Sequence, residues 1–225
     1  MPKFAAGVVR FQRDVYPEKK PLFETLSKGQ SPEALFITCS DSRIELGMLT
    51  QTEPGDLFVV RNAGNIVPPH SNSTGATTAA IEFAVGGLKV PHIVICGHTD
   101  CGAMKGAVAP EKLDALPHVR DWLGYSRAAV DIVAAIGGDL DDHARMLLLL
   151  EQNVILQLNH LKTHPTVAVA LAMGTLQLHG WVYDIKDGEV YAYDEAANDF
   201  KPVSQRYAAQ VKKYMDAHGH SHADA

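Results

Sequence analysis

The chain has 225 residues, of which 46% are hydrophobic, and this length and composition predict one globular domain, residues 1–225, with a sizeable apolar core. The formal net charge is -6, from 20 Lys and Arg against 26 Asp and Glu, so no basic surface favours nucleic acid or an anionic membrane as a partner. No apolar stretch approaches the roughly 18 residues that a membrane-spanning helix needs.

Residues 1–30 are predicted to form a helical arm of one or two helices outside the sheet. A chain of this size can use such an arm to clasp a second subunit. The apolar run at residues 4–9 is too short for the core of a signal peptide, and charged residues follow it directly. Three cysteines in a chain without a visible export signal indicate a reducing compartment, where thiols stay free, and we expect the cytoplasm.

Four short apolar runs are typical of strands in a parallel sheet that is covered on both faces. They are residues 35–38, 57–60, 93–96 and 167–171. Helical stretches lie between these runs, with apolar residues recurring at helical spacing over residues 77–88, 122–135 and 142–161. Because strands and helices alternate, the predicted fold is α/β, with a central, mostly parallel sheet flanked by helices.

Two further runs, residues 181–185 and 189–193, lie on either side of an Asp187-Gly188 pair. Such a pair suits a tight turn, which predicts a hairpin at one edge of the sheet. Residues 216–225 are predicted to form a disordered tail. The tail contains His218, His220 and His222, which can bind metal adventitiously, and we assign it no function.

Cys39, His98 and Cys101 carry most of the chemical information in the chain. Two thiolates and one imidazole suit zinc, and three protein ligands leave one position of a tetrahedral ion for water or substrate. Cys39 and His98 each follow an apolar strand run, which is where α/β proteins place their sites. The alternative is that both cysteines are buried packing residues and His98 is a loop histidine, but the three together favour a catalytic metal site. Cys96 lies inside a strand run and is interpreted as packing.

Asp41 is two residues from Cys39 and can be a fourth metal ligand, because both side chains would point to one side of an extended segment. Arg43 can instead hold the Asp41 carboxylate off the metal through a bidentate ion pair. We therefore expect Asp41 to ligate the metal only in a closed state of the site. The alternative is an ordinary surface ion pair worth under about 1 kcal/mol.

These segments resemble the two signatures of the β-class carbonic anhydrases: the run from Cys39 to Arg43, and His98 with Cys101-Gly102. The run from Arg61 to Asn65 matches a third. The resemblance implies reversible hydration of carbon dioxide to bicarbonate and a proton by zinc-bound hydroxide. It also implies one zinc ion per subunit, held by the two cysteines and the histidine, with Asp41 and Arg43 as the catalytic dyad. The family's minimal unit is a homodimer, often doubled to a homotetramer, with sites near the subunit interface.

Within that family, residues 28–32 resemble the plant-like branch, although the chain is of bacterial type. The resemblance implies that Gln30 reaches a neighbouring subunit's site and that Phe58 and Phe83 line a small apolar substrate pocket, with Gly102 beside it. That branch commonly has tyrosine where this chain has Phe83, so the hydroxyl is missing here. Without the resemblance, both phenylalanines are more simply core aromatics.

Two other functions are compatible with the same residues. The site can act on carbon disulfide or carbonyl sulfide, which are linear electrophiles like carbon dioxide. Alternatively, the protein can be a catalytically inactive, zinc-binding regulatory module. The presence of both Asp41 and Arg43 disfavours the module, because a purely structural metal site does not need this pair.

Overall fold

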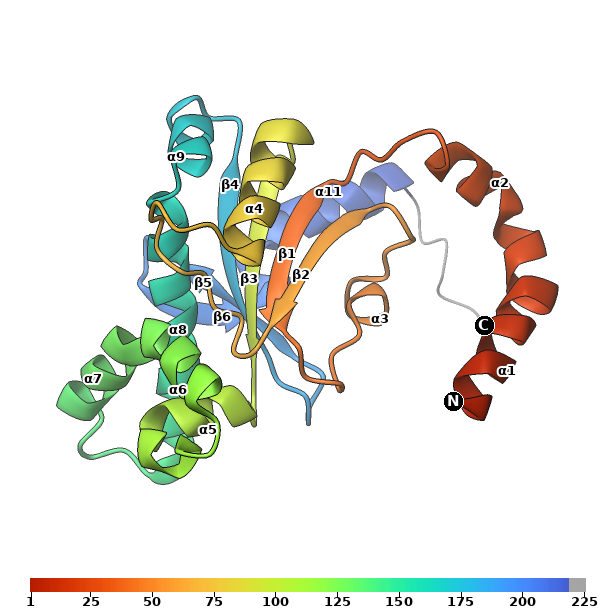
Figure 1. Cartoon of the computed structure of the whole chain (residues 1–225). Helices are drawn as coiled ribbons and strands as arrows, with labels where there is room; N and C mark the ends of the chain where they lie inside the picture. The colour runs from red at the N-terminus through yellow and green to blue at the C-terminus, as the bar shows by residue number, and fades with distance from the viewer. Residues whose placement is uncertain (219–225) are drawn as a thin grey trace.

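The computed structural model describes residues 1–218, and in this part of the chain a six-stranded sheet forms the centre of the molecule (Figure 1). The strands lie in the order β2-β1-β3-β4-β5-β6. The first four are parallel, and β5 and β6 pair antiparallel to their neighbours, which confirms the predicted α/β fold with a mostly parallel sheet. The strands are β1 (Ala34–Cys39), β2 (Leu57–Asn62), β3 (His92–His98), β4 (Gln177–Tyr183), β5 (Val190–Asp194) and β6 (Asp199–Pro202).

Helices flank this sheet and extend from it (Figure 1). Two π-helical segments adjoin them: Phe11–Val15 joins α1 to α2, and Phe83–Gly87 follows α4. No helix in residues 1–218 has the length and hydropathy needed to cross a membrane. The helices are α1 (Pro2–Arg10), α2 (Tyr16–Leu26), α3 (Leu46–Thr50), α4 (Ala76–Glu82), α5 (Gly102–Val108), α6 (Pro117–Leu123), α7 (Arg127–Ile136), α8 (Asp142–Lys162), α9 (Pro165–Ala172), α10 (Val203–Arg206) and α11 (Ala208–His218).

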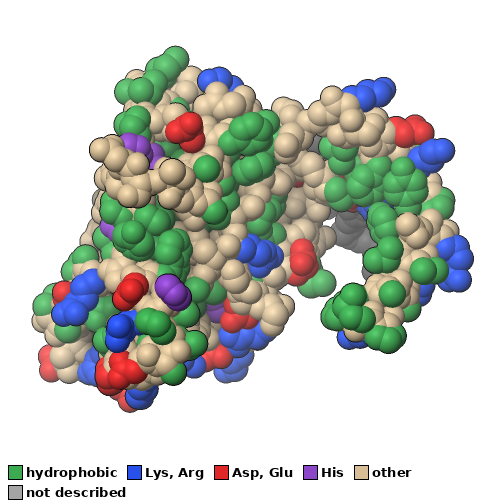
Figure 2. All heavy atoms as spheres, viewed as in Figure 1, with side chains coloured by type: hydrophobic (Ala, Val, Ile, Leu, Met, Phe, Trp, Pro, Cys, Tyr) green, Lys and Arg blue, Asp and Glu red, His purple; other side chains and the backbone are tan. Residues whose placement is uncertain are grey.

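The predicted helical arm is confirmed: α1 and α2 lie to one side of the sheet, joined to it by a non-helical link (Figure 1). Hydrophobic side chains lie along its surface (Figure 2), and Phe4 is 70% exposed in the single chain. One ion pair, between Lys19 and Glu53 at 2.6 Å, ties α2 to the segment before β2. Exposed apolar surface of this kind is typical of a segment that contacts another molecule.

One predicted strand is wrong: residues 167–171 lie in helix α9. An apolar run of this length fits a strand or a buried helix equally well by periodicity. Pro165 decides for the helix, because its fixed φ suits the first helical turn and a helix can begin there without losing a hydrogen bond. The fourth parallel strand is instead β4, which pairs with β3 from His92↔Gln177 to His98↔Tyr183.

The hairpin between β4 and β5 is confirmed, with Gly188 at φ 75° in its turn. A further strand, β6, pairs with the outer side of β5, so the hairpin is followed by an edge strand that the sequence reasoning missed. The tail prediction is wrong at its start, because α11 continues to His218. Residues 219–225, with His220 and His222, lie outside the described residues.

Helix α8 lies close against the sheet because two strand residues lack a side chain. A Cβ added at Gly180 in β4 would lie 2.7 Å from Val154 of α8, and one at Gly97 in β3 would lie 3.2 Å from the same valine. Every residue of β1 is buried, as expected for a central strand covered on both faces. The close approach brings the buried face of α8 near the carboxyl end of β3.

A partly buried chain of hydrogen bonds links β3, β4 and the residue before α11. His92 Nδ1 and His179 Nε2 are 3.1 Å apart, and His179 Nδ1 lies 3.0 Å from the Tyr207 hydroxyl. Burial, with smaller effects of His92 and Arg206, lowers the pKa of His179 to about 4. His179 is therefore neutral in the folded protein at neutral pH.

This depressed pKa predicts an acid-dependent loss of stability. Unfolded His179 binds a proton near its reference pKa of 6.5, whereas the folded protein resists protonation until about 4. The contribution of His179 to the free energy of unfolding is therefore fully present above pH 6.5. It is lost as the pH falls toward 4, by up to about 3 kcal/mol. Urea unfolding between pH 4 and 7 should show a smaller slope against pH in His179→Gln than in the unmodified protein. Equal slopes would contradict the prediction, and the exposed His118→Gln is the control.

Candidate metal centre

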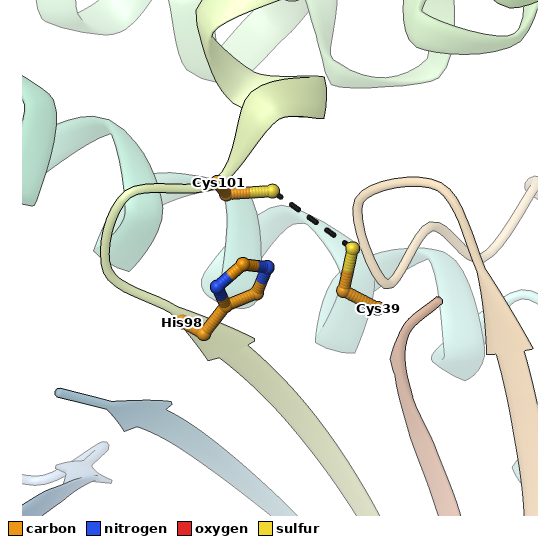
Figure 3. Close-up of side chains that lie close together, drawn as sticks. All are labelled: Cys39, His98 and Cys101. Atoms are coloured by element: carbon orange, nitrogen blue, oxygen red, sulfur yellow. Dashed lines mark hydrogen bonds between the residues drawn. The ribbon is translucent and has the colours of Figure 1, made fainter. Parts of the chain in front are cut away.

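Cys39, His98 and Cys101 converge at the carboxyl edge of the sheet (Figure 3). Cys39 is the last residue of β1 and His98 the last of β3, and these neighbouring parallel strands end side by side. Cys101 follows in the next loop as the N-cap residue of α5. Their ligand atoms all lie within 4.8 Å of one another, and the two sulfurs are 4.0 Å apart. The structure thus brings together the three residues that the sequence singled out.

The donor set fits a zinc ion. His98 Nδ1 lies 2.9 Å from the Thr99 carbonyl, to which it donates as the protonated ring nitrogen, so the lone pair of Nε2 faces the sulfurs. In residues 1–218, His98 Nε2 is fully buried and has no hydrogen-bond partner. A buried polar atom without a partner is costly unless it binds a ligand. Two sulfurs about 2.3 Å from a tetrahedral ion lie about 3.8 Å apart, close to the separation found here.

The two cysteines share negative charge. The Cys39 and Cys101 sulfurs share a hydrogen bond, and this contact, with smaller contributions from His98 and from the Gly64 N–H, lowers the pKa of Cys39. The same hydrogen bond, together with burial, raises the pKa of Cys101. The pair therefore loses its first proton more readily from Cys39 than from Cys101. A divalent ion would replace the shared proton and stabilise both thiolates.

Cys96 does not belong to this group. Its side chain is fully buried inside β3, and burial raises its pKa to about 12. Its thiol donates to the neighbouring Gly97 carbonyl, at 3.4 Å. The interpretation of Cys96 as packing is confirmed.

Asp41 and Arg43 form the expected bidentate pair, with Nε–Oδ1 at 2.9 Å and Nη2–Oδ2 at 2.8 Å. The backbone between them is a turn and not the extended segment that was predicted, because the Asp41 carboxylate also accepts the Arg43 backbone N–H at 3.0 Å. These contacts hold the pKa of Asp41 well below its usual range, so the carboxylate is ionised at neutral pH. Asp41 Oδ2 lies 3.9 Å from His98 Nε2, which places it beside the metal ligands.

Asp100 is a site residue that the sequence reasoning missed. Its carboxylate accepts from Arg43 Nη1 at 2.8 Å and from Lys105, so Arg43 is held between two aspartates. Lys105 first, and then Arg43, lower the pKa of Asp100 to about 2. Its backbone adopts φ 58°, which turns the chain between the two ligands His98 and Cys101. Its position inside that motif, with a charge opposite to that of Arg43, was the available signal.

The predicted pocket residues are only partly brought together. The rings of Phe58 and Phe83 are in contact, with centroids 5.9 Å apart, and Phe83 is 51% exposed rather than a core aromatic. Gly102 is the first residue of α5, directly after the ligand Cys101, and space is open around its Cα. Gln30 is exposed in the link after the arm. Their role as one substrate pocket stays a prediction.

Comparisons with known proteins agree on one family. Residues 34–190 match the family model described as "Carbonic anhydrase". A curated carbonic anhydrase from Pseudomonas aeruginosa is 49% identical over 199 residues, which cover 88% of this chain and 90% of that protein. A curated carbonic anhydrase from Synechocystis is 41% identical over 210 residues, covering 93% of this chain and 77% of that protein.

Solved structures give the same result. The β-carbonic anhydrase CcaA superposes with a TM-score of 0.87 at 41% identity, covering 90% of this chain and 91% of that chain. A β-carbonic anhydrase from Sordaria macrospora, described as tetrameric, superposes with a TM-score of 0.69 at 33% identity, covering 85% of this chain and 92% of that chain.

The convergence of two sulfurs and one imidazole predicts a metal site that can be measured without an assay of activity. Titration of metal-free protein with Co²⁺ should saturate at one ion per chain and produce the near-ultraviolet absorption of thiolate-to-cobalt charge transfer. Cys101→Ser should weaken binding more than about a hundredfold, beyond what loss of a residue that only supports a ligand costs. Cys96→Ser, the matched control, should bind normally. An undiminished titration in Cys101→Ser would rule out the site.

Proposed function

This chain belongs to the β-class carbonic anhydrases, and on that premise we propose that it hydrates carbon dioxide reversibly to bicarbonate and a proton at a zinc ion held by Cys39, His98 and Cys101. The observation that carries the proposal is the meeting of these three buried side chains around an imidazole nitrogen with no other partner. Thiolate and imidazole donors in a tetrahedral set favour zinc over the harder cations.

A bound zinc ion would supply a Lewis acid that provides hydroxide at neutral pH, for attack on the carbon of carbon dioxide. The protein's own residues would orient the reacting oxygen and keep the charged side chains around it in place. Asp41 is ionised, so near the metal it is a hydrogen-bond acceptor that can orient a water or hydroxide hydrogen. Arg43, held by Asp41 and Asp100, keeps that carboxylate in place.

The same pair can control access to the fourth metal position. In this structure Asp41 is bound to Arg43, which is the arrangement expected of an open site. The Asp41 carboxylate already lies 3.9 Å from His98 Nε2 while it is paired with Arg43. If Arg43 releases it, the carboxylate can reach the ion as a fourth ligand. We propose that Asp41 is a metal ligand only in that closed state.

We further propose that the active form is a homodimer or homotetramer. The arm exposes apolar side chains, and a structural relative is described as tetrameric. In such an assembly Gln30 would reach a neighbouring site, and Phe58, Phe83 and Gly102 would border the substrate pocket. The three unpaired cysteines suit a reducing compartment such as the cytoplasm.

Hydrolysis of carbon disulfide or carbonyl sulfide is the alternative reaction at the same site, and an inactive zinc-binding regulator is the alternative role. The ion pairs around Arg43 favour an enzyme over a regulator. They hold an ionised carboxylate, that of Asp41, beside the three proposed ligands, and a purely structural metal site does not need such a group.

Stopped-flow measurement of carbon dioxide hydration should show activity in the zinc-loaded protein. Asp41→Ala should lower kcat about a hundredfold or more while one zinc ion per chain is retained, because an orienting acceptor is lost and no ligand of the open site is. Asp131→Ala, which removes an exposed carboxylate of α7, is the control. Full zinc occupancy without hydration would favour the regulator, and turnover of the sulfur compounds alone would favour the alternative enzyme.

If the arm holds the oligomer together through its apolar surface, making that surface polar should dissociate the oligomer. Phe4→Ser with Val8→Ser should lower the mass measured by light scattering from that of the full oligomer toward that of smaller species, because these neighbouring side chains of α1 are 70% and 56% exposed in one chain. Lys3→Ser on the same helix should leave the mass unchanged. An unaltered mass in the double variant would show that the arm does not hold the assembly.

A further inference from the structure

Residues 63–68 form a loop after β2, which we call the sulfur-side loop, and it contacts the proposed metal ligand Cys39 directly. The Gly64 backbone N–H donates to Cys39 Sγ at 3.4 Å. Gly64 has φ 83°, and a Cβ on it would lie 2.9 Å from Met104 and 3.2 Å from Ala103. Both neighbours belong to α5, the helix that Cys101 caps. Only glycine therefore lets this peptide lie against Cys39 and α5 at once.

Side chains from two helices hold the carbonyls on either side of that N–H. Trp122 Nε1 in α6 donates to the Ala63 carbonyl at 2.8 Å, and Asn153 Nδ2 in α8 donates to the Gly64 carbonyl at 3.2 Å. The Ala63 carbonyl belongs to the same planar peptide group as the Gly64 N–H, and the Gly64 carbonyl belongs to the next one. With both carbonyls hydrogen-bonded, the Gly64 N–H cannot rotate freely. The direction of the Gly64 N–H is thus set by groups outside the loop.

Asn153 is itself locked in one orientation. Its side chain is 1% exposed, and its Oδ1 accepts from Ser126 Oγ at 2.8 Å and from Gln157 Nε2 at 2.9 Å. With Oδ1 used twice as an acceptor, the amide nitrogen must point to Gly64. Burying these polar groups is costly unless all are bonded, which indicates a specific role for the arrangement.

The contact continues along α8. Gln157 Oε1 accepts from the Val67 backbone N–H at 2.9 Å, and His160 Nδ1 donates to the Val67 carbonyl at 2.7 Å. Asn153, Gln157 and His160 are spaced by four and three residues, so they lie on one face of the helix. The sulfur-side loop is therefore aligned on α8 at both of its ends.

We propose that Asn153 is a positioning residue of the metal centre, which orients Gly64 so that its N–H donates to the Cys39 sulfur. The inference rests on the proposed function, since it requires a metal held by Cys39. A hydrogen bond to a thiolate takes up part of its negative charge and fixes its direction. Two thiolates weaken the Lewis acidity of an ion more than imidazoles do, and this bond offsets part of that effect.

Asn153→Asp tests the proposal with almost no change in shape. An ionised aspartate keeps both acceptor contacts, to Ser126 and Gln157, loses the donor to the Gly64 carbonyl and adds a buried negative charge, which the second variant below, Trp122→Phe, does not add. Zinc affinity, measured by chelator competition, should fall about tenfold. In the Co²⁺ protein the thiolate charge-transfer band should move to lower energy, because the sulfur loses a hydrogen bond. Asn159→Asp, the same change at an exposed position of α8, is the control.

Trp122→Phe provides an independent test, because it removes the hydrogen bond to Ala63 and keeps an aromatic ring. It should move the cobalt band in the same direction, and it decides the matter if Asn153→Asp does not fold. A lower melting temperature with unchanged affinity and unchanged band in both variants would mean a merely structural role and would overturn the proposal. If the unmodified protein binds metal but does not hydrate carbon dioxide, the proposed function fails while these shifts still test the positioning role.

Discussion

A buried imidazole nitrogen that has no hydrogen-bond partner within residues 1–218 is the constraint on which the site depends. The Thr99 carbonyl occupies Nδ1 of His98, so Nε2 is turned toward the sulfurs of Cys39 and Cys101. Such an atom is favourable only where a cation completes it. The parallel pairing of β1 and β3 makes the arrangement possible, because the two strands end next to each other and each delivers one ligand at its last residue.

Charge around this centre is balanced in two layers. Next to the ligands, the shared proton of Cys39 and Cys101 lowers the pKa of one thiol and raises that of the other. Farther out, Arg43 lies between Asp41 and Asp100, with Lys105 beyond. A carboxylate held by an arginine stays ionised and directed, and it can still be released. The proposed hydration chemistry would use a fixed set of ligands and a carboxylate that Arg43 can release toward the fourth metal position.

Helix α8 connects the fold to the chemistry. Gly97 and Gly180 let it approach the sheet, and its buried face then carries Asn153, Gln157 and His160 against the sulfur-side loop. Polar residues on the buried face of a helix cost free energy unless every group is bonded, and here the loop's backbone supplies the partners. The sheet, the helix and the metal ligands are thus one connected unit.

From the sequence alone, the alternating pattern determined the α/β fold, and the residue types and spacing predicted the candidate metal ligands and the Asp41–Arg43 pair, because donor chemistry is a property of side chains. The helical nature of residues 167–171 and the edge strand β6 depended on packing and strand pairing that periodicity does not encode. Asp100, Trp122 and Asn153 became site residues only in three dimensions. The polar spacing along α8 was visible in the chain, but what those side chains bind lies up to 93 residues away, and only the folded chain brings such partners together.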